Sequence, residues 1–145
     1  LNQRRLLHYP PQPEHQDEGV IGAQAHTDAA SFTILLQDQK GGLEVETPSG
    51  EWVVATPLEG SFVVNIGDFL RNWTNGNFLS VKHRVINNSQ ADRYSVPYFL
   101  DPDLSAVVEP IDFFTSTDNP PRYEPIHVGK YLCERFESIW PRKRS

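Results

Sequence analysis

Two histidines and one aspartate in this sequence could bind a metal ion together. His26 and Asp28 are separated by one residue, and His83 lies in a later apolar segment. Two imidazoles and one carboxylate leave neighbouring coordination positions open, which is typical of Fe(II) sites that activate oxygen. Arg93 and Ser95 follow His83 and could hold a carboxylate ligand, because a guanidinium can make two charge-assisted bonds to one carboxylate. The combined pattern predicts a non-haem iron site.

Each of these residues has a simpler explanation when it is taken alone. A His-x-Asp sequence is common in surface turns, a histidine on an apolar strand is often a core residue, and an isolated arginine is most often a surface charge. Two histidines and a carboxylate also bind zinc in hydrolases. A zinc hydrolase, however, leaves Arg93 and Ser95 unexplained. The occurrence of all these residues in this order favours the iron site.

Short β-rich segments separated by turn signals must position these residues. The Pro48-Ser49-Gly50 turn predicts a hairpin between two of them. Many short strands at this spacing indicate a barrel or sandwich rather than an alternating α/β fold, and a jelly roll would enclose the site. The predicted strands are residues 31–36, 43–46, 51–56, 61–66, 79–86 and 93–100.

Alternation along these strands places the candidate residues in one interior. Side chains two residues apart share a face of a strand. His26 and Asp28 are therefore expected to bind one metal from adjacent positions on a strand. His83 shares its face with two valines, and the same rule groups the residues of the last strand. The residues grouped with Arg93 are Ser95, Pro97 and Phe99.

The last element is predicted to be an amphipathic helix over residues 128–140. Its apolar residues recur at steps of three and four, and Pro125 and Pro141 flank it. We expect the helix to pack on the outside of the β-core. Cys133, beside the apolar stripe, is interpreted as a small packing residue.

The amino-acid composition favours certain classes of binding partner and of cellular compartment. The 145 residues suit one domain, and the net charge of −6 argues against a nucleic-acid partner. The single cysteine, Cys133, excludes an internal disulfide and favours a reducing compartment, so a cytoplasmic location is expected. No apolar run has the length of about 20 residues that spans a bilayer, so no membrane association is expected.

The chain resembles the C-terminal catalytic portion of the Fe(II)/2-oxoglutarate-dependent dioxygenases related to isopenicillin N synthase. The resemblance runs from about Leu6 to Asp103. It implies a mainly β fold, the double-stranded β-helix or jelly roll, with the C-terminal amphipathic helix beside it. The motifs that carry it are Tyr9-Pro10, His26-Thr27-Asp28, Gly41-Gly42-Leu43-Glu44-Val45, Asn65-Ile66-Gly67-Asp68, Thr74-Asn75-Gly76, His83-Arg84-Val85 and Arg93-Tyr94-Ser95.

The resemblance implies a role for each matching residue. His26, Asp28 and His83 match the iron ligands, which are also the catalytic centre. Arg93 and Ser95 match the pair that binds the far carboxylate of 2-oxoglutarate.

Three further positions bear on the cosubstrate and the substrate. Tyr9 matches a tyrosine that often contacts the cosubstrate, and its phenol could donate to the same carboxylate. Phe99 matches a position that commonly lines the substrate pocket, although it could equally be a core residue. Leu7 departs from the family, because many relatives carry an asparagine there, so one polar contact is expected to be absent.

The implied activity is oxidation of a small organic substrate by hydroxylation or desaturation. Fe(II), 2-oxoglutarate and O2 would take part, and succinate and CO2 would be released. Two alternatives stay open: a 2-oxoglutarate-independent Fe(II) oxidase, in which Arg93 and Ser95 bind the substrate's own carboxylate, and a non-catalytic jelly-roll binding protein. Residues 1–145 are expected to form a single catalytic domain that lacks the family's N-terminal helical region, and to be monomeric like many relatives.

Overall fold

The structure is a computed structural model that describes residues 2–11, 20–87 and 90–139. Its strands are β1 (Gln3–Arg4), β2 (Leu7–Tyr9), β3 (Val20–His26), β4 (Phe32–Gln37), β5 (Leu43–Glu46), β6 (Trp52–Val54), β7 (Val63–Ile66), β8 (His83–Asn87), β9 (Arg93–Leu100), β10 (Val107–Val108) and β11 (Ile126–His127). Its helices are α1 (Asp68–Trp73), the short 3-10 helix η1 (Asp112–Phe114) and α2 (Val128–Ile139).

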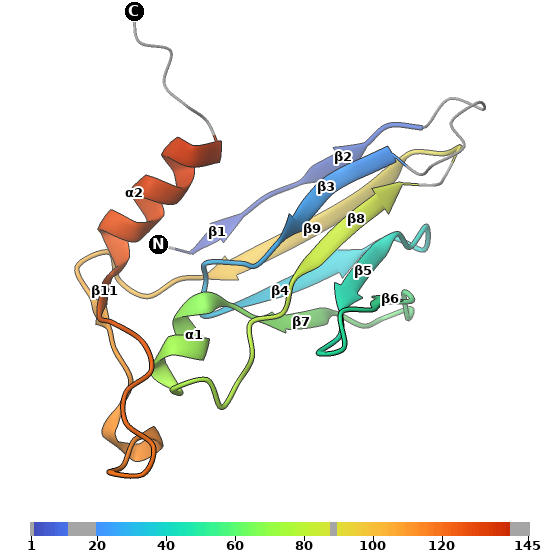
Figure 1. Ribbon diagram of the computed structural model, residues 1–145. Helices are drawn as coiled ribbons and strands as arrows, with labels where there is room; N and C mark the ends of the chain where they lie inside the picture. The colour runs from blue at the N-terminus through green and yellow to red at the C-terminus, as the bar shows by residue number, and fades with distance from the viewer. Residues whose placement is uncertain (1, 12–19, 88–89, 140–145) are drawn as a thin grey trace, which may run out of the picture.

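Two antiparallel sheets form the body of the molecule (Figure 1). One sheet has the order β1-β9-β4-β7, with β2 also paired to β9, and the other has the order β3-β8-β5-β6. Most neighbours in each sheet are distant in sequence, as in a jelly roll. Side chains from both sheets line one inner cavity, so the sheets face each other. The predicted mainly β, jelly-roll fold is confirmed.

The predicted strands over residues 31–36, 43–46 and 93–100 match β4, β5 and β9 to within one residue, whereas β7 begins at Val63 rather than at residue 61. Strands β1, β2, β10 and β11 were not predicted. The hairpin of β5 and β6 forms as predicted, although β6 is shorter than residues 51–56. The predicted strand over residues 79–86 is correct only from His83 onward. The ladder of β8 with β3 ends where His83 pairs with His26, so residues 79–82 have no strand partner on that side. Helix α1 was not predicted, because its six residues are too few to show a helical period.

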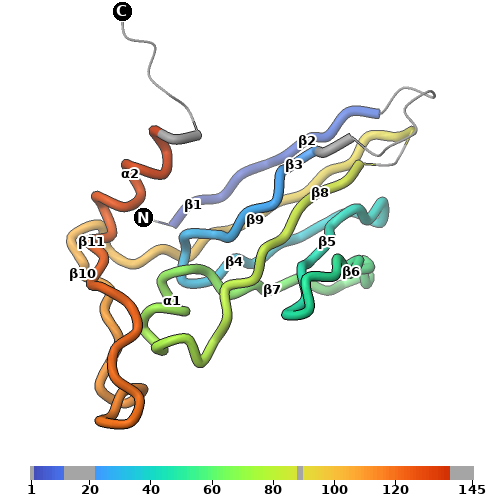
Figure 2. The backbone as a smooth tube through the Cα atoms, in the orientation of Figure 1, coloured from blue at the N-terminus to red at the C-terminus, as the bar shows by residue number. Residues whose placement is uncertain are grey.

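A small apolar core joins the helices at one end of the sandwich. It consists of the buried side chains Phe69, Val108, Val128 and Leu132, which come from α1, β10 and α2. Figure 2 shows α1, β10 and β11 at this same end, below α2. Helix α2 therefore covers the end of the β-body, which agrees with the predicted position outside the β-core.

The C-terminal helix follows the prediction closely. It begins at Val128 as expected and ends at Ile139, while Trp140 lies outside the described residues. Cys133 is exposed, so its interpretation as a packing residue is wrong. The residue before it, Leu132, is the one that turns into the core. Across the described residues, no helix combines the length and the apolar character needed to cross a membrane.

Candidate metal centre and adjoining cavities

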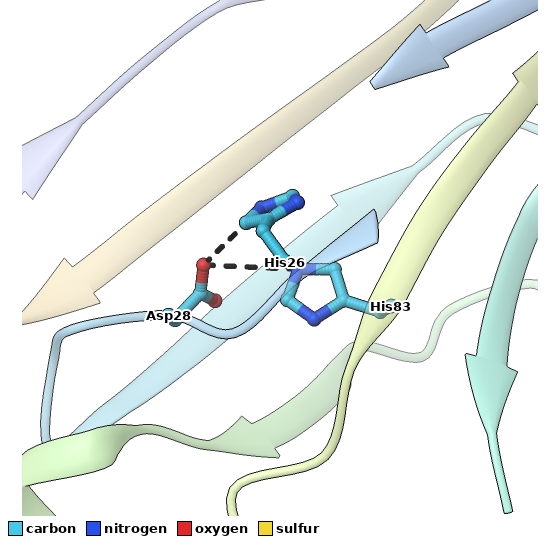
Figure 3. Close-up of side chains that lie close together, drawn as sticks. All are labelled: His26, Asp28 and His83. Atoms are coloured by element: carbon cyan, nitrogen blue, oxygen red, sulfur yellow. Dashed lines mark ion pairs between the residues drawn. The ribbon is translucent and has the colours of Figure 1, made fainter. Parts of the chain in front are cut away.

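His26, Asp28 and His83 come together at the end of β3 (Figure 3). His26 is the last residue of β3 and pairs in register with His83, the first residue of β8. Oδ1 of Asp28 lies 3.7 Å from Nε2 of each histidine. Asp28 itself lies in the turn beyond the strand, so the prediction that His26 and Asp28 occupy adjacent strand positions is wrong. The turn nevertheless brings its carboxylate to the two imidazoles.

Asp28 is oriented by two hydrogen bonds to its other oxygen. Oγ1 of Thr33 donates to Oδ2 at 2.5 Å, and Nδ2 of Asn65 donates to the same atom at 2.8 Å. The carboxylate is 7 % exposed, so these bonds replace the water that burial removes. They leave Oδ1 for a metal ion. Sequence reasoning assigned no role to Thr33 or Asn65, although Asn65 is a polar residue within an apolar strand.

Each imidazole has a nitrogen that can bind a metal ion. Nδ1 of His26 lies 2.6 Å from the carbonyl oxygen of Gln24. A carbonyl only accepts, so Nδ1 donates this bond, and Nε2 is the nitrogen that faces Asp28, as in many metal sites. Burial lowers the pKa of His83 below 6.5, and the nearby Asp28 carboxylate opposes this shift only in part. His83 is therefore neutral at neutral pH, which is the form that binds metals.

The turn that carries Asp28 is anchored to the start of α1. The amide of Asp68 donates to the carbonyl oxygen of Asp28 at 2.8 Å, and the amide of Phe69 lies 3.3 Å from the carbonyl oxygens of Ala29 and Ala30. Gly67 permits this approach, because a Cβ atom there would overlap the carbonyl oxygen of Ala30. The first amides of α1 have no partner within the helix, so they are available to this turn.

The inner cavity between the sheets has a volume of ≈ 220 Å³ and contains the metal candidates. Arg93 lines it and is 1 % exposed. Nε of Arg93 donates to the carbonyl oxygen of Gly41 at 2.5 Å, and the guanidinium lies 4.7 Å from the ring centroid of Tyr9. Among the described residues, neither terminal guanidinium nitrogen of Arg93 has a hydrogen-bond partner. The cavity therefore holds a buried cation with two unused donors.

The remaining predicted residues also face this cavity. Ser95 and Pro97 are buried, whereas Tyr94 between Arg93 and Ser95 is exposed, which confirms the predicted alternation of β9. Phe99, on the same face, lines the cavity as well. The apolar side chain of Leu7 occupies the lining where many relatives are expected to have an asparagine.

A larger, outer cavity of ≈ 660 Å³ meets the inner one at the metal candidates. His26, Asp28 and Phe99 line both cavities. The outer wall also includes residues of α2 and the carboxyl group of Asp101. Burial raises the pKa of Asp101 above 3.8, and the Asp28 carboxylate adds to the effect. His26 and Asp28 thus lie between the two cavities, and His83 lines the inner one.

The other described histidines lie elsewhere. Nε2 of His8 is 2.6 Å from Oδ1 of Asp92, and both side chains are about half exposed. His127 is exposed at the end of β11, directly before α2. Neither residue belongs to the group that could hold a metal ion.

A jelly roll that gathers two histidines and an aspartate beside a cavity with a buried arginine defines the class of non-haem iron oxygenases. Comparison with known sequences agrees with this class. The sequence model of the 2OG-Fe(II) oxygenase superfamily matches residues 1–102. The chain belongs to this superfamily.

Individual relatives support the same assignment. The 2-oxoglutarate-Fe(II) type oxidoreductase hxnY of Emericella nidulans is 41 % identical over 140 residues, which are 95 % of this chain and 40 % of that protein. A full-length Neurospora crassa protein crystallised with alpha-KG has a TM-score of 0.88 at 37 % identity, over 96 % of this chain and 45 % of that one. The rice dioxygenase for auxin oxidation has a TM-score of 0.85 at 34 % identity, over 95 % and 47 %. The chain spans less than half the length of these relatives.

Proposed function

We propose that this chain is the catalytic portion of an Fe(II)- and 2-oxoglutarate-dependent oxygenase that hydroxylates or desaturates a small organic substrate. Succinate and CO2 would be the products from the cosubstrate. Membership of the 2OG-Fe(II) oxygenase superfamily supports the proposal, and so do the relatives that were crystallised with alpha-KG.

The buried guanidinium of Arg93 is the observation that carries this proposal. A buried charge without full hydrogen bonding destabilises a fold, so such groups usually have a partner. Arg93 has two unpaired terminal nitrogens in a cavity that reaches the metal candidates. A dicarboxylate that enters the cavity would give these nitrogens two charge-assisted bonds. Ser95 on the same strand face would supply a hydroxyl to the same carboxylate.

The distance along the strands suits a molecule held at both ends. Tyr9 packs over Gly22 near the start of β3, whereas His26 ends that strand. Gly22 and His26 are four positions apart along β3, so the arginine end and the metal end of the cavity are on the order of 10 Å apart. Tyr9 would limit the width of the cavity and orient the guanidinium of Arg93 through their stacking.

His26, Asp28 and His83 would hold the iron. Oδ1 of Asp28 lies 3.7 Å from each Nε2, and the ligand atoms all lie within 4.8 Å of one another, so small movements of the side chains would let them bind one ion through bonds of about 2.1 Å. When bound, Fe(II) would supply the activation of O2 that the oxidation of 2-oxoglutarate and substrate requires. The chain contributes the ligand geometry, and Thr33 and Asn65 keep the carboxylate of Asp28 turned toward the metal. The apolar walls of the inner cavity exclude water.

The outer cavity is the proposed substrate site. It is lined by His26 and Asp28, and Phe99 lines both this cavity and the inner one. The Neurospora crassa relative has been crystallised with thymine, so a small organic molecule is a suitable class of substrate. We extend the proposal to a cytoplasmic enzyme without a nucleic-acid partner, on the basis of the lone cysteine and the acidic composition, and to a monomer, by analogy with the family.

Anaerobic titration of the full-length protein with Fe(II) and 2-oxoglutarate tests the proposal. The chelate of Fe(II) and 2-oxoglutarate is expected to give a weak charge-transfer band at about 500 nm. The band should be lost in Arg93→Ala at the same cosubstrate concentration and kept in Arg4→Ala, which changes an exposed arginine. Iron binding without the band would instead support the 2-oxoglutarate-independent oxidase. Absence of iron binding in the wild type would contradict both enzymes and leave a non-catalytic jelly roll.

A further inference from the structure

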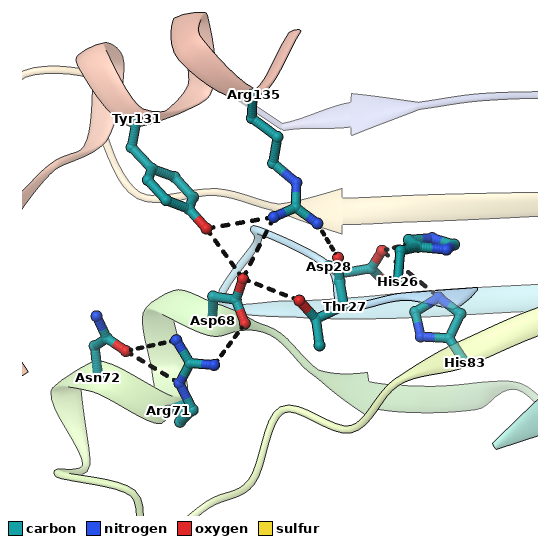
Figure 4. Close-up of polar contacts among 9 residues, drawn as sticks. All are labelled: His26, Thr27, Asp28, Asp68, Arg71, Asn72, His83, Tyr131 and Arg135. Atoms are coloured by element: carbon teal, nitrogen blue, oxygen red, sulfur yellow. Dashed lines mark hydrogen bonds and ion pairs between the residues drawn. The ribbon is translucent and has the colours of Figure 1, made fainter. Parts of the chain in front are cut away.

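We infer that Arg135 is a positioning residue for the metal centre, through which helix α2 fixes the turn that carries Asp28. This inference rests on the proposed function, because it concerns the same iron site. Arg135 does not contact the candidate ligand atoms. It acts on the backbone between His26 and Asp28 and on the buried carboxylate of Asp68, as Figure 4 shows.

Arg135 makes its contacts across a large sequence distance. Its Nη2 donates a hydrogen bond to the carbonyl oxygen of Thr27. Its Nη1 lies 3.6 Å from Oδ2 of Asp68 and 3.3 Å from the hydroxyl of Tyr131, one turn earlier on α2. The side chain of Arg135 is 30 % exposed, so solvent screens these interactions only in part.

Asp68 is the common partner of the three segments that meet here. It is 3 % exposed, and its Oδ2 accepts hydrogen bonds from Oγ1 of Thr27 at 3.2 Å and from the hydroxyl of Tyr131 at 3.1 Å. Its Oδ1 forms an ion pair with Arg71 at 3.0 Å. The buried carboxylate thus links α1, α2 and the turn after β3.

These contacts hold both peptide groups that flank the Cα atom of Asp28. The carbonyl of Thr27 and the amide of Asp28 belong to one planar peptide, so Arg135 fixes the plane before Asp28. The amide of Asp68 fixes the plane after it through the carbonyl of Asp28. Because β3 ends at His26, no strand ladder holds this turn. Arg135 therefore restricts the position from which the Asp28 carboxylate reaches the metal.

The binding of Co(II) alone to the full-length protein under anaerobic conditions tests this inference. Arg135→Met keeps an apolar stem of similar length and removes every donor. We expect its Co(II) affinity to fall by about tenfold, the lower end of the range for residues that orient metal ligands. The visible spectrum of bound Co(II) should also change, because it reports the ligand geometry. Arg135→Lys should recover part of the affinity, since it keeps a cation and a donor.

Lys130→Ala is the matched control on the same helix. Lys130 is exposed and forms its ion pair with Glu134 on the same helix, so Co(II) binding should be unchanged. Arg71 still pairs with Asp68 in the Arg135 variants, so the buried carboxylate keeps one cation and the fold should persist. A melting temperature measured on each variant establishes this.

The outcomes separate this inference from the proposed function. Wild-type affinity and an unchanged Co(II) spectrum in Arg135→Met would overturn the positioning role and leave the iron site intact. Failure of the wild type to bind Co(II) would overturn the proposed site itself. If Arg135→Met does not fold, Arg135→Lys decides, because its side chain offers one nitrogen where the guanidinium uses two, one for Thr27 and one for Asp68. Wild-type Co(II) affinity together with an unchanged Co(II) spectrum in that variant would also overturn the inference.

Discussion

Thr33 donates a 2.5 Å hydrogen bond from Oγ1 to Oδ2 of Asp28, the oxygen that faces away from the two imidazoles. The bond joins the second residue of β4 to the turn that precedes that strand. The two carboxylate oxygens therefore have different roles, because Oδ2 is hydrogen-bonded by the protein and Oδ1 stays available to bind a metal ion. This arrangement leads to the first two predictions.

Asp28→Ala should abolish Fe(II) binding and succinate formation. The substitution removes the only candidate carboxylate ligand among the described residues and leaves two imidazoles, which hold Fe(II) weakly without a charged donor. Iron titration and a succinate assay measure the two effects. Asp118→Ala, which changes an exposed aspartate, should behave like the wild type. Unchanged succinate production by Asp28→Ala would disprove the ligand assignment.

Thr33→Val should weaken metal binding without removing it. The new side chain has a similar shape, while Oδ2 of Asp28 keeps the bond from Asn65. We expect metal affinity to fall by about tenfold, because partners of a ligand commonly contribute that much. Calorimetric titration with Co(II) measures the change, with Thr115→Val as a control at a distant 3-10 helix. Equal affinities for wild type and Thr33→Val would show that Asn65 alone orients Asp28.

Arg93→Met should separate fold stability from cosubstrate binding. Without cosubstrate, we expect the melting temperature to stay the same or rise, since the variant no longer buries a partly unsatisfied cation. In the presence of metal, 2-oxoglutarate at a hundred times its Kd should stabilise the wild type by about 2.7 kcal/mol. The variant should lose this stabilisation. A thermal shift with 2-oxoglutarate that persists in Arg93→Met would place the cosubstrate elsewhere.

Gly67→Ala should destabilise the protein more than Gly50→Ala does. A Cβ atom at Gly67 would overlap the carbonyl oxygen of Ala30, in the turn that holds Asp28. Gly50 has nothing within 4 Å but has a φ of +87°, so its substitution costs about 1 kcal/mol from backbone strain alone. Urea denaturation measures both changes in the free energy of unfolding. Similar losses for the two variants would mean that the turn moves away from α1 at little cost.

Asp101→Asn should raise the melting temperature at neutral pH. The pKa of Asp101 is raised above 3.8 mainly by burial, so the folded state binds this proton more tightly than the unfolded state. The carboxyl group therefore stabilises the fold at low pH, and this contribution is lost as the pH rises through the folded-state pKa.

The pH dependence provides the check on Asp101. The stabilisation by Asn should be small, because Asp101 is only partly buried, and it should disappear below pH 3.8, where the carboxyl group is protonated in both states. Melting temperatures of wild type and variant across this pH range measure it. A wild type that is the more stable protein at neutral pH would show that the attraction to Arg5 outweighs burial.

The alternation of residues along single strands could be predicted from the sequence alone. Arg93 and Ser95 face inward and Tyr94 faces outward, because a strand turns successive side chains to opposite sides whatever lies next to it. The bounds of β9 and the start of α2 follow from equally local patterns of apolar residues and turn signals. The types of the ligand residues likewise indicate the metal chemistry, because imidazole and carboxylate groups have the same preferences for metal ions in any fold.

The tertiary structure decided how these residues are held. Asp28 lies in a turn and not on a strand. Its carboxylate is held by hydrogen bonds from Thr33 and Asn65, and the turn itself is held by a hydrogen bond from Arg135 to Thr27. These hydrogen bonds join segments that are separate in the sequence. Local periodicity reports only the face of an element on which a residue lies. Which residue of another segment it contacts depends on sheet register and on how helices pack. Register and packing are set by the summed contacts of the whole chain rather than by any one segment.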